Sequence, residues 1–170
     1  MSSEPTGRAT TADVRLDRVV DDADRVVAFE RYRPEHYGGL VDMYDDFPPE
    51  QRAQGLPPAT ESAITEWLAV LLDHVSVLAV HDGAVVGHAA LVPDDAGNYE
   101  LGVFVGDDYQ DAGVGSALLE ATFEYARTIG ITDVWLSVAR SNHRARHVYD
   151  ALGFAEAGGK GRSLRLAMSL

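Results

Sequence analysis

One loop combines glycines with the start of a helix, and it holds the residues best suited to bind an anionic ligand. It reads Tyr109-Gln110-Asp111-Ala112-Gly113-Val114-Gly115-Ser116, between a predicted strand and a long predicted helix. Glycines let the backbone approach a ligand closely, and the first helical turn leaves N–H groups unpaired at the positive end of the helix dipole. The loop therefore predicts a phosphate or pyrophosphate site built from backbone donors, although two glycines at a helix start also occur in ordinary tight turns.

Two better-known phosphate-binding patterns do not fit this loop. No Gly-Lys-Ser/Thr follows it, so it is not a P-loop. Only two of the three glycines of a dinucleotide fingerprint are present, and the hairpins predicted before the loop do not suit that fold.

Other reactive side chains form no convincing constellation. His143 and His147 are four residues apart on a predicted helix, but without a third ligand they are better read as solvated histidines, and no metal site is predicted. His81 and His88 flank a hairpin and need no special role. A serine hydrolase is unsupported, because no His/Asp partners are evident for Ser116, Ser137 and Ser141.

Hydrophobic periodicity predicts the elements that position the loop. Helical spacing marks four segments, with Thr60 capping the second: residues 34–45, 60–73, 113–129 and 143–152. Strand patterns mark residues 26–32, 75–81, 85–92, 99–105 and 133–139, and two short strands, near Phe154 and over residues 163–170, joined by a glycine turn at residues 158–161. Residues 47–58, with four prolines, are expected to form a loop or a short helical turn.

These elements predict one mixed sheet. Asp82-Gly83 is a strong hairpin signal, whereas the strand–helix–strand unit over residues 99–139 requires a parallel crossover. The expected fold class is α/β (α+β), with a mixed central sheet of six to seven strands and helices on both faces. Residues 1–24 are expected to be a mobile polar tail, and residues 25–170 a single domain.

Two motifs resemble one known family. The pattern Gln110-x-x-Gly113-x-Gly115 is similar to the Gln/Arg-x-x-Gly-x-Gly/Ala signature of the GNAT N-acetyltransferase superfamily. Downstream, the family's Asn-x-x-Ala-x-x-x-Tyr-x-x-x-Gly-Phe segment is matched by Asn142, Ala145, Tyr149, Gly153 and Phe154. The resemblance is clear from about residue 77 to residue 155.

The resemblance implies an acetyl-CoA site between two splayed parallel strands. It implies that the pantetheine arm bonds to the backbone of Val103, Phe104 and Val105, which are also expected to be core strand residues. It assigns the pyrophosphate to Asp111, Ala112, Gly113, Val114, Gly115 and Ser116. Asn142 would hydrogen-bond the cofactor, or serve simply as a helix N-cap.

Acyl transfer from the thioester requires a neutral amine and a leaving thiol. A lysine-like amine has a pKa of about 10.4, so a base must remove its proton. Protein-lysine acetyltransferases of the superfamily resemble this chain in carrying a glutamate at the position of Glu100, which makes Glu100 the candidate base; the alternative is an exposed strand carboxylate. Tyr149 matches the family's general acid, with a packing tyrosine as the alternative, and the N–H of Val105 is a candidate oxyanion donor.

One position departs from the family. Acetyltransferases of ribosomal-protein N-termini often carry a glutamate on the fifth strand, where this chain has Ser137. The departure counts against an N-terminal amine as acceptor and gives Glu100 more weight.

Composition sets outer limits on function. The 170-residue chain has no cysteine, no apolar run of about 20 residues and no apolar stretch typical of a secretory signal, so a cytoplasmic protein without disulfides or a membrane span is expected. A net charge of −13 argues against a nucleic-acid partner. Many Asp residues and a single lysine, Lys160, resemble proteins of haloarchaea, although a GC-rich genome also favours Arg over Lys.

Three functions remain open. The leading one is an N-acetyltransferase that moves an acetyl group from acetyl-CoA to a primary amine of a small molecule or a protein. The others are a non-catalytic acyl-CoA-binding regulatory module and a nucleotide-binding protein that uses the same glycine loop. Acceptor contacts are expected from residues 37–72, and a homodimer is possible through strand addition at the sheet edge.

Overall fold

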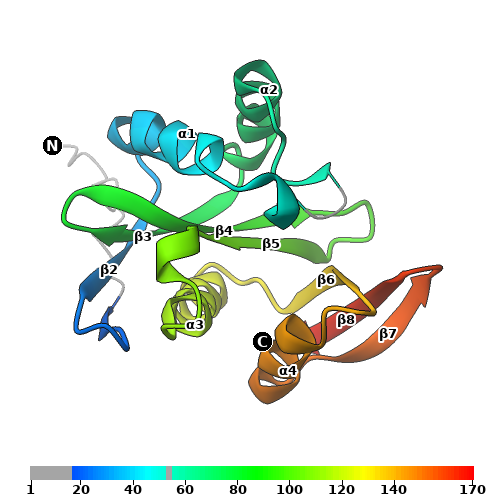
Figure 1. Cartoon of the computed structure of the whole chain (residues 1–170). Coiled ribbons are helices and arrows are strands. Elements are labelled where there is room, and N and C mark those ends of the chain that lie inside the picture. The colour runs from blue at the N-terminus through cyan, green and yellow to red at the C-terminus, as the bar shows by residue number, and fades with distance from the viewer. Residues whose placement is uncertain (1–16, 53–54) are drawn as a thin grey trace, which may run out of the picture.

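The computed structural model describes residues 17–52 and 55–170, which form one sheet flanked by helices (Figure 1). The eight strands lie in the spatial order β1-β2-β3-β4-β5-β6-β8-β7. Their bounds are β1 Arg18–Val20, β2 Val26–Arg31, β3 Val75–His81, β4 Ala84–Pro93, β5 Tyr99–Val105, β6 Asp133–Ala139, β7 Ala155–Lys160 and β8 Ser163–Ser169. All neighbours are antiparallel except β5 and β6, so the mixed sheet with a single parallel pair is confirmed.

Four α-helices cover the two faces of this sheet. They are α1 Tyr37–Asp45, α2 Glu61–Leu71, α3 Val114–Thr128 and α4 His143–Leu152. Figure 1 shows α1 and α2 on one face and α3 and α4 on the other. The connections include the short 3-10 helices η1 Pro34–His36, η2 Pro49–Gln51 and η4 Asp107–Tyr109.

Two strand predictions need correction. The expected tail extends to residue 24, but Arg18–Val20 form β1, which pairs with β2; the part of that prediction covering residues 1–16 lies outside the described residues. A three-residue edge strand has too few positions for a period to be recognised. Gly158 and Gly159, expected in the last turn, instead belong to β7, and the turn is Gly161-Arg162, because Lys160 pairs with Ser163.

The helix predictions hold within one or two residues at most ends. Thr60 caps α2 as expected, since its side chain accepts a hydrogen bond from the Ala63 N–H at 3.3 Å. The first predicted helix divides into η1 and α1, which meet at Tyr37.

A buried polar chain joins α1 to the sheet. Ser76 of β3 donates to the Leu71 carbonyl at 3.5 Å, so it accepts from His88 Nε2, 2.9 Å away. The other ring nitrogen, Nδ1, then accepts from the Tyr44 hydroxyl at 2.6 Å. His88 is fully buried, and burial lowers its pKa to about 3, which keeps the imidazole neutral. His88 therefore has a structural role that the sequence did not indicate, because the hydrogen bonds through its ring connect α1 to the sheet.

Candidate active site

The parallel strands β5 and β6 separate after two residue pairs. They pair at Tyr99 with Val134 and at Glu100 with Trp135, and no pair follows. From Leu101 onward the facing edges diverge, which leaves one edge of β5 without a strand partner. This is the splayed arrangement that the family resemblance implies.

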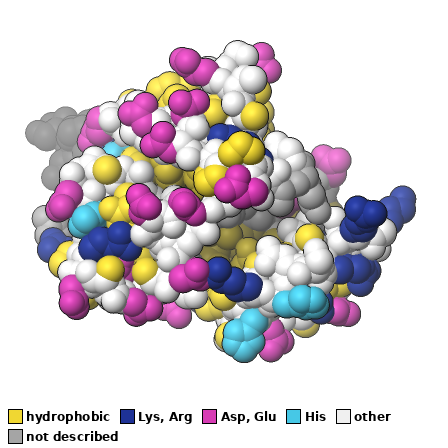
Figure 2. Space-filling view, viewed as in Figure 1, with side chains coloured by type: hydrophobic (Ala, Val, Ile, Leu, Met, Phe, Trp, Pro, Cys, Tyr) yellow, Lys and Arg dark blue, Asp and Glu magenta, His cyan; other side chains and the backbone are white. Residues whose placement is uncertain are grey.

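The space between the two strands is a cleft of about 790 Å³. It passes from one face of the sheet to the other, because its walls include Trp67 and Val70 of α2 and Ala145 and Tyr149 of α4. Figure 2 shows a hollow with hydrophobic side chains between the part of the molecule that carries α2 and the part that carries α4. The cleft brings together six of the predicted site residues: Glu100, Val103, Phe104, Val105, Asn142 and Tyr149.

The backbone of β5 faces the cleft at alternate residues. Directly after β5, the Gly106 N–H donates to the Val86 carbonyl of β4. Because the direction of the backbone N–H and C=O groups alternates along a strand, those of Phe104 point to β4, and those of Val103 and Val105 point to the cleft. The Val105 carbonyl accepts from Gln110 Nε2 at 2.9 Å, which agrees with this direction. Of the three expected backbone contacts, Val103 and Val105 therefore have the geometry for added-strand bonding, whereas Phe104 contributes its ring.

Glu100 and Tyr149 lie on opposite faces of the sheet. The side chains of Glu100 and Phe104 share a face, because they are four residues apart in one strand. The Phe104 ring packs at 5.2 Å on Trp67 of α2, so this is the α1–α2 face. Tyr149 belongs to α4 on the other face, and the cleft connects the two.

Glu100 lines the cleft and remains exposed to solvent, as expected for the alternative of an exposed strand carboxylate. Partial burial raises the pKa of its carboxyl; Arg165 opposes this rise and Asp94 adds to it. Arg165 is itself engaged, since its guanidinium carbon lies 3.8 Å from the Trp135 ring centroid and one nitrogen lies 3.9 Å from Asp94. A raised pKa strengthens a carboxylate as a proton acceptor.

Tyr149 has the environment of a donor. Its ring packs against Phe154 at 5.7 Å, and burial raises the pKa of Tyr149 to about 12. Among the described residues its hydroxyl has no hydrogen-bond partner, so the proton is available to a ligand in the cleft. With this pKa the phenol stays protonated at neutral and alkaline pH.

Asn142 caps α4. Its side-chain oxygen accepts from the Ala145 N–H at 3.1 Å, which is the simpler of the two expected roles. The residue also lines the cleft, and its amide nitrogen remains a possible donor to a ligand.

The glycine loop follows the cleft directly. Gln110 lines the cleft, and the next residues turn into α3, whose first turn presents the N–H groups of Val114, Gly115 and Ser116 without intrahelical acceptors. Gly113 has a φ of +86° and open space where a Cβ would lie, which suits a close anion. The chain's residues thus fit an anionic cofactor arm with its phosphates on this loop.

Two glutamine side chains hold the beginning of the loop. Gln110 Nε2 bonds the Val105 carbonyl and also Gln51 Oε1, at 2.6 Å, while Gln51 Nε2 bonds Asp107. Gln51 comes from η2 in the proline-rich segment, 59 residues before Gln110. No local pattern in the sequence identifies this contact.

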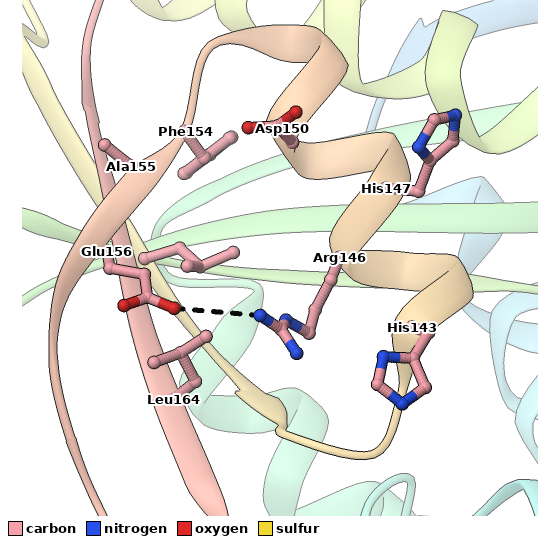
Figure 3. Close-up of a pocket in the computed structure, with 9 residues that line it drawn as sticks. His143, Arg146, His147, Asp150, Phe154, Ala155, Glu156 and Leu164 are labelled. Atoms are coloured by element: carbon pink, nitrogen blue, oxygen red, sulfur yellow. Dashed lines mark ion pairs between the residues drawn. The ribbon is translucent and has the colours of Figure 1, made fainter.

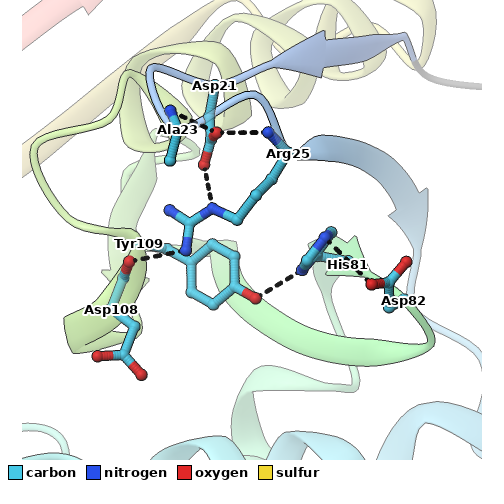
Figure 4. A network of polar contacts seen from close by, with 7 residues as sticks. All are labelled: Asp21, Ala23, Arg25, His81, Asp82, Asp108 and Tyr109. Carbon is cyan, nitrogen blue, oxygen red and sulfur yellow. Dashed lines mark hydrogen bonds and ion pairs between the residues drawn. The ribbon is translucent and has the colours of Figure 1, made fainter.

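A second brace comes from the turn between β1 and β2. Figure 4 shows Arg25 bonded to Asp21 and lying over the Tyr109 ring, while the Tyr109 hydroxyl meets His81 Nδ1 at 2.6 Å. Arg25 also donates to the Asp108 carbonyl at 3.0 Å, and the Asp22 N–H bonds the Ala112 carbonyl at 3.1 Å. The segment expected to be a tail therefore supports the glycine loop.

A smaller hollow of about 350 Å³ lies beside α4. Figure 3 shows Arg146 paired with Glu156 at 3.7 Å, with His143 and His147 along the same helix. In residues 17–52 and 55–170, no three His, Cys, Asp or Glu side chains are grouped so that they could hold a metal ion. Over the same residues, no helix combines the length and hydrophobicity needed to cross a membrane.

Fold and site together define an acyltransferase architecture, and residues 39–154 match the acetyltransferase (GNAT) family, to which this chain belongs. It is similar to mycothiol acetyltransferase from Propionibacterium freudenreichii, with 31% identity over 151 residues, 84% of this chain and 43% of that protein. It is also similar to the [ribosomal protein bS18]-alanine N-acetyltransferase of Escherichia coli K12, with 42% identity over 55 residues, 32% of this chain and 37% of that protein. The chain thus spans less than half the length of these curated relatives.

A solved structure supports the fold across nearly the whole chain. The GNAT domain of S. lividans PAT superposes with a TM-score of 0.78 at 20% identity, covering 91% of this chain and 96% of that one. At this identity the similarity concerns the fold alone.

Proposed function

We propose that this protein is an N-acetyltransferase that uses acetyl-CoA to acetylate a primary amine. The observation that carries the proposal is the cleft through the sheet, which has a carboxylate of raised pKa on one face and a protonated phenol on the other. Family membership and relatives named as N-acetyltransferases support it.

Acetyl-CoA supplies the acetyl group as a thioester. Residues 111–116 bind its pyrophosphate through backbone N–H groups, and Val103 and Val105 bond its pantetheine arm as a neighbouring strand would. Asn142 adds one side-chain donor. These contacts hold the thioester in the cleft between the two faces.

Glu100 and Tyr149 divide the proton transfers. Glu100 removes the proton from the incoming ammonium, directly or through water, so that the amine nitrogen can attack. The N–H of Val105 is directed into the cleft and stabilises the oxyanion that develops. Tyr149 donates a hydrogen bond to the departing sulfur, and its high pKa keeps that donor protonated at every working pH.

A thiol-release assay tests the activity directly, since the chain has no cysteine to interfere. With acetyl-CoA and a panel of primary amines, Glu100→Gln is expected to lower kcat by about 10²–10⁴-fold with CoA affinity unchanged. Glu120→Gln, an exposed carboxylate on α3, is the matched control. CoA binding without turnover of any amine would instead support the regulatory module.

The cellular setting follows from composition alone. A cytoplasmic enzyme adapted to high salt is proposed from the excess of acidic residues, and its test is the salt dependence described below.

A further inference from the structure

The two faces of the cleft are used by different reactants. The glycine loop leads into α3, so the phosphates and the pantetheine arm enter from the α3–α4 face. The acceptor must then approach from the α1–α2 face, where Glu100 lies. The chemistry of that face therefore indicates which amine fits.

The charged side chains that line the described cleft are both acidic. Among the described residues lining the cleft, Glu50 and Glu100 carry carboxylates, and there is no Lys, Arg or His. Arg165, the cation that acts on Glu100, already lies over Trp135 and beside Asp94. An ammonium is attracted here, whereas a carboxylate would meet like charge and find no free cation.

Beside the uncharged polar side chains of Gln51 and Ser137, most of this wall is apolar. Phe47, Trp67 and Leu71 form its inner part, and Val70 and Leu56 its rim. Val70 is 57% exposed and Leu56 43%, and they are two of the five large hydrophobic side chains exposed in the described part of the chain. Exposed apolar groups gathered at the mouth of a cleft are typical of a surface that a ligand covers.

We propose that the acceptor is a hydrophobic primary amine that carries no carboxylate next to its amino group. The proposal rests on the acetyltransferase function proposed above. The ammonium binds between the carboxylates and its apolar body covers the Val70 rim. One proton of the ammonium goes to Glu100, and the nitrogen then forms the C–N bond as the C–S bond breaks. Tyr149 gives its proton to the departing sulfur, so that CoA leaves as the thiol, and the second proton lost by the nitrogen returns to Tyr149 through water.

Matched amine pairs test this class. Acetylation of 2-phenylethylamine is compared with that of phenylalanine, and 3-methylbutylamine with leucine, because each pair differs only by the carboxylate. We expect kcat/KM to be at least about tenfold higher for the amine without the carboxylate, and ethanolamine to be a similarly poor acceptor. Equal values within both pairs would overturn the inference and leave the acetyltransferase function standing.

Two variants test whether the apolar wall of the cleft causes the preference for hydrophobic amines. Val70→Asp is expected to lower kcat/KM for 2-phenylethylamine about tenfold while leaving CoA affinity unchanged. Val26→Asp is the matched control, since Val26 is 52% exposed on β2, away from the cleft. A Val70→Asp enzyme that keeps its preference for 2-phenylethylamine would refute the apolar rim.

A binding measurement separates the proposed acetyltransferase function from the proposed class of acceptor. Titration of 2-phenylethylamine into the CoA complex reports recognition without chemistry. Tight binding with no acetylation would retain the ligand class and remove the proposed reaction, whereas turnover of ethanolamine alone would retain the reaction and remove the ligand class.

Discussion

The guanidinium carbon of Arg25 lies 3.9 Å from the centroid of the Tyr109 ring. Arg25 follows the turn between β1 and β2, and Tyr109 begins the loop that leads to α3, so the two ends of this contact are 84 residues apart in sequence. Because Arg25 also bonds Asp21 and the Asp108 carbonyl, it fixes the position of the loop without touching the cleft.

Removal of this brace should weaken cofactor binding. Arg25→Ala is expected to raise the Kd for CoA about tenfold, because the free loop must be ordered when the cofactor binds. It should also lower the free energy of unfolding, since the Asp21 carboxylate loses its charged partner. Isothermal titration and urea unfolding measure the two effects. Arg31→Ala is the control, because Arg31 lies over Tyr125 at 4.7 Å, far from the loop; an equal loss of CoA affinity there would rule out a specific brace.

The two glycines of the loop should respond differently to alanine. Gly113 has a φ of +86°, so Gly113→Ala forces a side chain into a left-handed conformation, at a cost of about 1 kcal/mol, and displaces the backbone that faces the phosphates. Gly115 is helical, and a Cβ there meets Val105 at an ordinary 3.5 Å. We expect CoA affinity to fall at least about tenfold for Gly113→Ala and to stay near the parent value for Gly115→Ala. The reverse order would remove the phosphate assignment.

Tyr149→Phe isolates the donor hydroxyl. The ring keeps its packing on Phe154, so stability and CoA affinity should change little, while kcat falls by about 10²–10⁴-fold. The pKa of about 12 also predicts that the parent's kcat shows no loss of this donor below pH 10. Stopped-flow thiol release gives both numbers, and an unchanged kcat in Tyr149→Phe would assign the proton to water.

His88 should make the fold sensitive to acid. Its pKa is about 3 in the folded chain and about 6.5 unfolded, so its stabilising effect is complete above pH 6.5 and is lost progressively as the pH falls toward 3. At pH 5 this group alone lowers the free energy of unfolding by about 2 kcal/mol relative to neutral pH. Urea unfolding at pH 7 and pH 5 measures it. His88→Gln should be less stable than the parent at pH 7 but should lose less on acidification; equal losses would mean that other groups titrate.

Salt should stabilise this chain. Residues 1–139 hold eight Lys and Arg against 25 Asp and Glu, whereas residues 140–170 hold six against two. Figure 2 shows Lys and Arg gathered on the side where β7 and β8 lie, with Asp and Glu spread over the rest of this face. Molar KCl shortens the Debye length to about 3 Å and screens the acidic repulsion, so Tm should rise by roughly 10 °C from dilute buffer. A flat Tm would refute adaptation to high salt.

The sequence by itself determined the elements whose signals are local. β3, β5, β6 and α4 begin and end where their periodicity predicted, because each is long enough to show a repeating apolar face. The glycine loop was identifiable for the same reason, since its glycines and the helix that follows are contiguous in the chain. The two motifs also predicted the family.

Tertiary structure decided everything that depends on register or on distant partners. The short β1 and the glycine-containing β7 exist because β2 and β8 offer them hydrogen-bonding edges, not because of their own propensity. The direction of the backbone at Phe104 follows from pairing with β4, which no local pattern encodes. Gln51, Arg25 and His88 act through residues 12 to 84 positions away. Their roles arise only when packing brings those partners within hydrogen-bonding or ring-contact distance.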